Sequence, residues 1–307
     1  MTEIRRILCP IDFSDFSRRA LDHAVAIAKT YRSTVTVLHV STIAPVAAYV
    51  SGSGLPPHTS LTPLDREALL ASVKRFATID AGAGVSLECD VAEGPAATAI
   101  LAWAEAMPAD LLVLGTHGRS GFERLVLGSV AEKVLRKATC PVLTVPGGAG
   151  KETLAPPVMF RRILCALDFS DCSIHALRFA MSLAEQTEAH LTVLHVIELP
   201  PDIPREPHEP ILAAPRDLRE YIALAEDDCT RRLQKVIPDA LRVRGIVDTL
   251  LATGKPYREV LRVAAEKNSD LIVIGIHGRG PIDRLFFGST TEQVVRHATC
   301  PVLTLRT

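Results

Sequence analysis

Short apolar runs alternate along the chain with longer segments in which apolar residues recur every three or four positions. Residues 6–11 (RILCPI) form such a run, and residues 17–31 follow with a periodic stripe. The stripe comprises Ala20, Leu21, Ala24, Val25 and Ala28. A short continuous run is consistent with a buried strand, and a period of three to four predicts an amphipathic helix. The pattern therefore predicts a strand followed by a helix.

The same alternation continues through the first half of the chain. Further strands are expected at residues 34–40, 85–94, 110–115 and 140–145. Further helices are expected at residues 65–79, 95–107 and 128–138. The first, second, fourth and fifth strands lack polar alternation, which is typical of parallel strands buried on both faces. Right-handed crossovers would then place helices on both sides of one sheet.

The pattern occurs twice in the chain. RRILCPIDFSD (5–15) returns as RRILCALDFSD (161–171), and KATCPVLTV (137–145) returns as HATCPVLTL (297–305). The repeat unit is domain-sized, unlike the ~20–50-residue units of solenoids. We therefore predict two tandem α/β domains, residues 1–146 and 160–307, joined by a proline- and glycine-rich linker at 147–159.

A glycine-rich turn follows the fourth predicted strand of each half. GTHGRSGFERLVLGS (115–129) and GIHGRGPIDRLFFGS (275–289) share the spacing G-x2-G-x9-G-S. Ser129 with Glu132, and Ser289 with Glu292, predict capping boxes at the next helix. Amide groups at a helix N-terminus attract phosphate, and open parallel sheets bind ligands beyond the carboxyl ends of their strands. Each turn therefore predicts a phosphate site.

Other sites and other roles compete with this hypothesis. The chain has neither GxxxxGK[ST] nor a GxGxxG after its first strand, so a P-loop and a dinucleotide-binding Rossmann site are disfavoured. Glycines also end strands, and serines also cap helices, in any α/β protein. Three pairs of residues have two readings each. Asp12 and Asp168 could contact a ligand or belong to helix caps with Ser14 and Ser170. His117 and His277 could contact phosphate or shape the turn. Glu123 and Asp283 could act near phosphate or form solvated surface pairs. His39 and His195, on predicted buried strands, are expected to be satisfied by hydrogen bonds.

Bulk composition narrows the class of protein. The 34 basic and 35 acidic residues are nearly balanced, which gives no support for a nucleic-acid partner. No apolar run approaches the ~18 residues that a membrane helix needs. The seven cysteines form no CxxC pair and are expected to be free thiols, with a redox role for Cys172 or Cys229 a minor alternative. These features favour a cytoplasmic location.

The turn spacing resembles the ATP-binding signature of the universal stress protein family. The aspartate after the first strand, the LHV strand and the TCPV ending of each half are similar to that family as well. The resemblance implies flavodoxin-like domains with strand order 3-2-1-4-5 and ATP, with or without Mg²⁺, across the ends of strands 1 and 4. Asp12 and Asp168 would lie at the adenine and ribose end, and the main chain of Val40 and Val196 would contact adenine.

The resemblance also implies which positions surround the nucleotide. In the first half these are Pro10, Ile11, Asp12, Val40, Gly115, Thr116, His117, Gly118, Arg119, Gly128, Ser129 and Val130. In the second half they are Ala166, Leu167, Asp168, Val196, Gly275, Ile276, His277, Gly278, Arg279, Gly288, Ser289 and Thr290.

The second turn departs from the first in ways that put equal occupancy of the two sites in doubt. Pro281 replaces Gly121, Ile276 replaces Thr116, and Phe286-Phe287 replaces Val126-Leu127. The resemblance further implies that the last strands of the halves pair as an intramolecular pseudo-dimer, with a homodimer as an additional arrangement. The two proline-rich insertions after the second strands are candidate lids or partner surfaces.

The function expected from this resemblance is a nucleotide-dependent switch or partner-binding module in a stress response. Two alternatives stay open. One is a slow ATP hydrolase or phosphotransferase, although the sequence offers no convincing nucleophile or metal cluster, so that at most weak ATPase activity is expected. The other is a nucleotide-free pseudo-dimeric scaffold.

Overall fold

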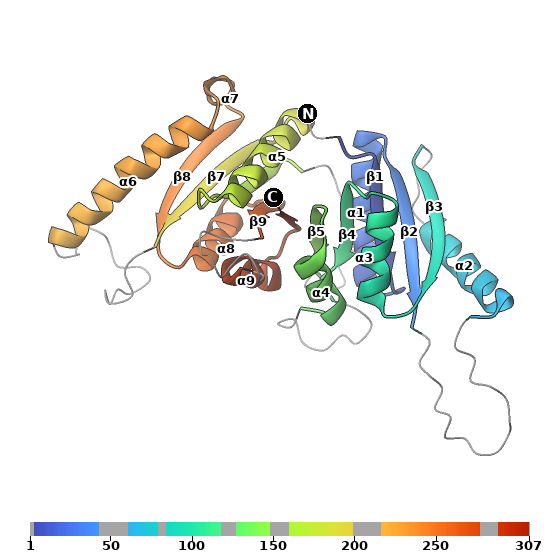
Figure 1. The fold of residues 1–307 in the computed structure, drawn as a ribbon. Helices are drawn as coiled ribbons and strands as arrows, with labels where there is room; N and C mark the ends of the chain where they lie inside the picture. Colours follow the sequence, from blue (N-terminus) through green and yellow to red (C-terminus); the bar gives the residue numbers. More distant parts are fainter. Residues whose placement is uncertain are drawn as a thin grey trace, which may run out of the picture. The chain divides into compact units, whose positions relative to one another are not determined.

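A computed structural model describes residues 3–42, 61–78, 84–117, 127–147, 160–198, 216–276 and 288–306. The chain divides into two compact units, Glu3–Met159 and Phe160–Thr307, which we call the first and second units. Each unit, taken by itself, is an α/β domain in which helices cover a sheet (Figure 1).

The sheet of the first unit is parallel throughout its described strands. The strands are β1 (Arg6–Ile11), β2 (Thr34–Ser41), β3 (Ser86–Glu93), β4 (Leu111–Gly115) and β5 (Val142–Val145). Their order is β3-β2-β1-β4-β5, which confirms the predicted order 3-2-1-4-5. In the register, Ile7 of β1 lies opposite Val35 of β2 and Leu111 of β4. Strand β1 is therefore central, as its apolar composition predicts.

Two layers of helices cover this sheet. The helices are α1 (Asp15–Tyr31), α2 (Pro63–Thr78), α3 (Ala96–Ala106) and α4 (Ser129–Lys137). Helices α1 and α2 pack on one face, while α3 and α4 pack beside each other on the opposite face (Figure 1). This is the doubly wound arrangement expected from right-handed crossovers between parallel strands.

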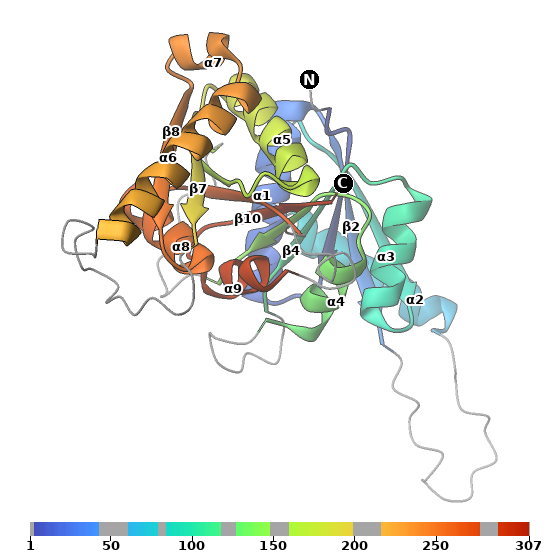
Figure 2. The same ribbon diagram turned by 60° about the vertical axis from the view of Figure 1, so that its left-hand side comes forward.

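The second unit repeats the topology. Its strands are β6 (Arg162–Ala166), β7 (His190–Ile197), β8 (Val247–Thr253), β9 (Leu271–Gly275) and β10 (Val302–Leu305), in the order β8-β7-β6-β9-β10. Its helices are α5 (Asp171–Thr187), α6 (Arg216–Val236), α7 (Asp239–Val243), α8 (Pro256–Glu266) and α9 (Ser289–His297). Helix α7 is a short addition between α6 and β8 (Figure 2). It was not predicted because five residues are too few to show a helical period.

The centre of each unit is made of branched aliphatic side chains on the middle strands. Leu8, Val37 and Leu112 have no exposed surface in the first unit, and neither do Leu164 and Ile272 in the second. Burial of such side chains is the dominant favourable term in folding. The continuous apolar runs in the sequence therefore correspond to strands that are buried on both faces of the sheet, as in other parallel sheets.

All seven cysteines are free, in agreement with the expectation. Four are buried, and Cys9 and Cys165 lie at equivalent places in the central strands β1 and β6. Burial raises the pKa of the Cys165 thiol to about 12 and raises that of Cys9 further still. Both thiols are thus uncharged at neutral pH and pack in the core as small apolar side chains.

Every helix in the described residues is too short or too polar to cross a lipid bilayer.

Candidate functional site

The carboxyl ends of three neighbouring strands bring the predicted residues of each half to one sheet edge. In the second unit, Val196 lies on β7, Asp168 follows β6 and Gly275 ends β9. These strands are adjacent and parallel, in the order β7-β6-β9. In the first unit, Val40 and Asp12 occupy the equivalent places at the ends of β2 and β1.

This edge of the second unit is hollowed into a cavity of about 590 Å³. Eight of the predicted second-half positions line it: Ala166, Leu167, Asp168, Val196, Gly275, Gly288, Ser289 and Thr290. Ile276 is almost completely buried instead, with 2% of its surface exposed. His277, Gly278 and Arg279 lie outside the described residues, as do Glu123, Asp283, most of the proline-rich insertions and residues 148–159 of the linker. A cavity of this size falls within the range typical of small-molecule sites.

The first unit places its predicted residues at corresponding points. Pro10 and Ile11 belong to β1, Gly115 ends β4, and Ser129 and Val130 begin α4 immediately after Gly128. Gly118 and Arg119 lie outside the described residues.

The aspartate after the first strand of each unit holds the start of the next helix. The Ser14 backbone N–H and hydroxyl donate to Asp12 Oδ1 at 3.1 and 2.5 Å, and the Ser14 hydroxyl oxygen accepts from Ser17 N–H. Asp168 repeats this arrangement with Ser170, at 2.9 and 2.6 Å. The capping role considered from the sequence is therefore present in both units. It does not exclude a ligand role, since a carboxylate has several acceptor sites.

The residue after each aspartate adopts a left-handed backbone. Phe13 has φ 64° and Phe169 has φ 65°, a conformation that non-glycine residues rarely take. This turn places each phenylalanine ring against a histidine of the neighbouring strand, with ring centroids 4.6 Å apart for His39 and 4.7 Å for His195.

Both strand histidines are fixed by the main chain. His39 Nδ1 lies 2.9 Å from the Ile11 carbonyl oxygen, and His195 Nδ1 lies 2.7 Å from that of Leu167. The prediction that these histidines are satisfied by hydrogen bonds is confirmed. They tie the ends of the first two strands of each unit together.

The helix that follows each glycine turn begins one residue earlier than predicted. Gly128 and Gly288 are the N-cap residues, and no side chain among the described residues caps either helix. The capping boxes expected from Ser129 and Ser289 are therefore wrong. The shift places Glu132 and Glu292 too far along the helix to reach the N-cap amide, and they pair instead with Arg136 at 3.0 Å and Arg296 at 2.6 Å.

The missing caps matter for chemistry. The N-cap amides are used: Gly128 N–H donates to Thr116 O at 2.8 Å, and Gly288 N–H donates to Ile276 O at 3.0 Å. The next amides, which belong to the first helical turn, have no partner within a helix. In the second unit this turn lines the cavity with Ser289 and Thr290. Uncapped first-turn amides at a cavity wall form a potential anion-binding surface.

The glycines have packing roles that the sequence did not reveal. A Cβ on Gly275 would lie 3.0 Å from backbone atoms of Cys172 and Ser173, and one on Gly115 would lie 3.0–3.1 Å from Phe16. A Cβ on Gly288 would lie 2.9 Å from the Ile276 carbonyl oxygen. Close approach of the protein's own chain therefore explains these three glycines, whatever ligand they also accommodate.

His117 is held at the end of the described part of the first turn. Its Nδ1 lies 2.9 Å from the buried Thr116 hydroxyl, and its ring stacks on Phe16 with centroids 5.3 Å apart. Its Nε2 is buried and has no hydrogen-bond partner in the part of the chain that the structure describes. These contacts fix the ring against Thr116 and Phe16, while contact with phosphate and shaping of the turn both stay predictions.

Several cavity residues were missed by the sequence reasoning. Helix α6 contributes Tyr221, Asp228 and Arg232, and α9 contributes Thr291. The Thr291 hydroxyl donates to the Gly275 carbonyl oxygen at 2.8 Å and so ties α9 to the end of β9. Polar residues on a helix are usually solvated, so nothing in the sequence separated these from an ordinary exposed face. No group of three potential metal-ligating side chains occurs within the described ranges.

Comparison with known proteins shows the same duplication. A profile of the universal stress protein family matches residues 3–146 and 159–306. A universal stress protein of Methanocaldococcus jannaschii is 37% identical over 144 residues, which cover 46% of this chain and 81% of that protein. A universal stress protein of Mycolicibacterium smegmatis is 25% identical over 307 residues, which cover 98% of this chain and 96% of that protein.

Solved structures extend the comparison to the fold. A universal stress protein from Archaeoglobus fulgidus has a TM-score of 0.65 at 22% identity, covering 98% of this chain and 96% of its own. A universal stress protein in complex with cAMP is 25% identical, with a TM-score of 0.33, and covers 46% of this chain and 94% of its own. Since the family profile matches nearly the whole chain in two copies, this protein belongs to the universal stress protein family.

Proposed function

We propose that both units bind ATP at the carboxyl edge of their sheets, and that the chain acts as a nucleotide-dependent switch or partner-binding module in a stress response. The observation that carries the proposal is the second-unit cavity. Asp168, Val196, Gly275 and the first turn of α9 all line this one cavity. The first unit repeats the same residue types on the same elements.

The order of the strands gives the nucleotide a direction. Val196 lies on β7, Asp168 follows β6 and Gly275 ends β9, so these three positions run across the sheet edge in that sequence. The triphosphate belongs at the Gly275 side, where the uncapped first turn of α9 offers amide donors and the hydroxyls of Ser289 and Thr290. The base and ribose then lie toward Asp168 and Val196.

Magnesium would enter with the triphosphate rather than bind to a protein cage. Mg²⁺ is usually held by substrate phosphates and water with one or two carboxylates. This mode requires no cluster of three ligating side chains, and the described residues contain none.

Proline substitution at the first helical position isolates the amide contribution. Ser129→Pro and Ser289→Pro each remove one first-turn N–H, and proline is well tolerated there. The preceding glycines already have the extended backbone that a residue before proline requires, with φ −59° and ψ 139° at Gly128 and φ −58° and ψ 137° at Gly288. Loss of a hydrogen bond to a charged group costs about 1.5–3 kcal/mol, so we expect ATP affinity at the altered site to fall by about 10–100-fold.

Matched alanine variants provide the control. Ser129→Ala and Ser289→Ala remove only the hydroxyl, so they should weaken ATP binding less than the proline variants do. Binding is measured by titration calorimetry of the full chain with MgATP, and thermal unfolding checks that each variant folds. If the wild-type protein takes up no ATP at millimolar concentrations, or the double proline variant binds as the wild type does, the proposal is wrong.

A further inference from the structure

One wall of the second-unit cavity is a polar face of α6. Tyr221, Ala225, Asp228, Cys229 and Arg232 line the cavity. Their spacing of three and four residues puts them on one side of the helix. Helix α6 packs beside β7 and β8, so this face bounds the cavity on the side of Val196 and away from the first turn of α9.

Asp228 and Arg232 are neighbours on this face but do not pair with each other. The Arg232 guanidinium carbon lies 4.0 Å from the centroid of the Phe169 ring. The Asp228 carboxylate lies 3.9 Å from a guanidinium nitrogen of Arg231, and both of those side chains are more than half exposed. Within the described residues no carboxylate is within ion-pair distance of Arg232. The Phe169 ring thus holds the guanidinium by stacking, which leaves its N–H donors at the cavity available.

The two side chains complement a particular base edge. The arginine guanidinium only donates hydrogen bonds and an ionised carboxylate only accepts them, and each can form two parallel hydrogen bonds at once. Guanine presents two acceptors, O6 and N7, next to each other, and two donors, on N1 and N2, on the adjoining edge. In adenine the N6 donor lies between the acceptors N7 and N1. Adenine therefore offers neither two adjacent acceptors to arginine nor two adjacent donors to a carboxylate, and neither side chain can form two hydrogen bonds with it.

We propose that Asp228 and Arg232 make the second-unit cavity selective for a guanine base. The inference rests on the proposed function, since it requires that the base of a bound nucleotide lies toward Val196 and α6. It means that GTP binds the second unit more tightly than ATP does.

The equivalent positions of the first unit, Ser72 and Phe76, hold no such pair, which makes this unit an internal reference. Phe76 of α2 packs against Phe13 with ring centroids 5.5 Å apart, as Arg232 packs against Phe169. Both Phe13 and Phe76 precede their counterparts by 156 positions, and the same offset takes Asp228 back to Ser72. A hydroxyl and a phenyl ring offer no matched pair of charged groups, so the first unit should not prefer guanine.

The test compares GTP with ATP at each site of the full chain. In the Ser129→Pro background the second site dominates, and in the Ser289→Pro background the first site dominates. Titration calorimetry should give GTP binding about tenfold or more tighter than ATP in the first background, since each bidentate contact is worth about 1–3 kcal/mol of discrimination. No such preference is expected in the second background.

Exchanging residues between units completes the test. Asp228→Ser with Arg232→Phe installs the first-unit residues and should abolish the GTP preference, while Arg232→Lys keeps the charge without the two parallel hydrogen bonds and should reduce it. If the second site shows no preference for GTP, or keeps it after the exchange, the inference is wrong. If neither nucleotide binds in either background or in the wild type, the proposed function fails instead, and thermal unfolding confirms that each variant folds.

Discussion

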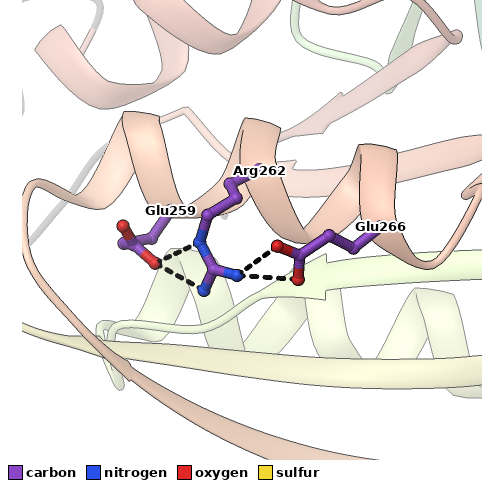
Figure 3. A network of polar contacts seen from close by, with 3 residues as sticks. All are labelled: Glu259, Arg262 and Glu266. Atoms are coloured by element: carbon purple, nitrogen blue, oxygen red, sulfur yellow. Dashed lines mark hydrogen bonds and ion pairs between the residues drawn. The ribbon is translucent and has the colours of Figure 1, made fainter. Parts of the chain in front are cut away.

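Helices α3 and α8 occupy the same place in the two units, yet their outer faces are opposite in character. On α8, Arg262 donates to Glu259 at 2.7 and 2.9 Å and to Glu266 at 2.6 and 2.7 Å (Figure 3). Counting from Gly94 in one unit and Gly254 in the other, the corresponding residues of α3 are Ala99, Ala102 and Ala106.

The inner faces of the same two helices agree. Ile100 and Ala104 of α3 are buried, as are Val260 and Ala264 of α8. Packing against the sheet tolerates little change in volume, while an exposed position tolerates almost any residue. The comparison teaches that the duplicated fold is held by its buried positions, while the outer helix face and the cavity wall are where the units have diverged.

The largest expected effect tests what both units share. Gly275→Ala and Gly115→Ala would each force a methyl group against the first turn of α5 or α1. Because backbone atoms are among the contacts, overpacking should cost about 1–3 kcal/mol of unfolding free energy in either unit. Urea denaturation followed by circular dichroism measures this, with the exposed Ser289→Ala as the control. If Gly275→Ala leaves the unfolding free energy unchanged, the close approach of α5 to Gly275 does not require a glycine.

A smaller effect is expected where the units differ at a buried position. Thr291→Val removes the hydroxyl that donates to the Gly275 carbonyl oxygen, a bond absent from the first unit, where Ala131 stands in its place. The loss should cost about 1 kcal/mol of unfolding free energy. Thr290→Val is the matched control. Equal stability of the two valine variants in urea would contradict the assigned role of Thr291.

The ion pairs of α8 should contribute less. Arg262→Ala is expected to lower the unfolding free energy by about 0.5 kcal/mol, because the pairs are partly exposed. The difference from wild type should shrink as salt rises. Ala102→Arg in the first unit adds a charge with one glutamate, Glu105, three residues on, so it should stabilise less than Arg262 does. A gain from Ala102→Arg equal to the loss from Arg262→Ala would show that the network has no specific geometry.

The smallest effect concerns pH and again separates the units. Burial lowers the pKa of His23 in α1, and a backbone hydrogen bond to Arg19 partly offsets this shift. The unfolded chain therefore takes up a proton below about pH 6.5 that the folded chain resists, so stability falls with acidification through that range. His23→Phe, which copies Phe179 of α5, should flatten this dependence. Urea titrations at pH 5.5 and 8 check it, and an unchanged slope would contradict the account.

The sequence was sufficient for the order of the described strands and helices, apart from the short α7, because buried parallel strands and periodic helices leave clear apolar patterns. The predicted strand at 6–11 has the bounds of β1, and the predicted helix at 17–31 lies within α1. The capping boxes failed because Ser-x-x-Glu does not fix which residue begins the helix. At Gly128 the deciding factor is a hydrogen bond to Thr116, which is distant in sequence.

The candidate site was only partly predictable. Glycine spacing and strand ends pointed to Asp168, Val196 and Gly275, since topology brings the ends of parallel strands together. Arg232 and Asp228 gave no such signal, because α6 reaches the cavity through tertiary packing. Charged residues on one side of a helix are indistinguishable, in sequence, from a solvated surface.

The left-handed turn at Phe169 brings three parts of the second unit into contact. Its ring lies between His195 of β7 and Arg232 of α6, and the residue directly before it is Asp168. Asp168 is therefore one residue away from a ring that contacts both the sheet edge and α6. Through these two side-chain contacts, position 169 connects the sheet edge with α6.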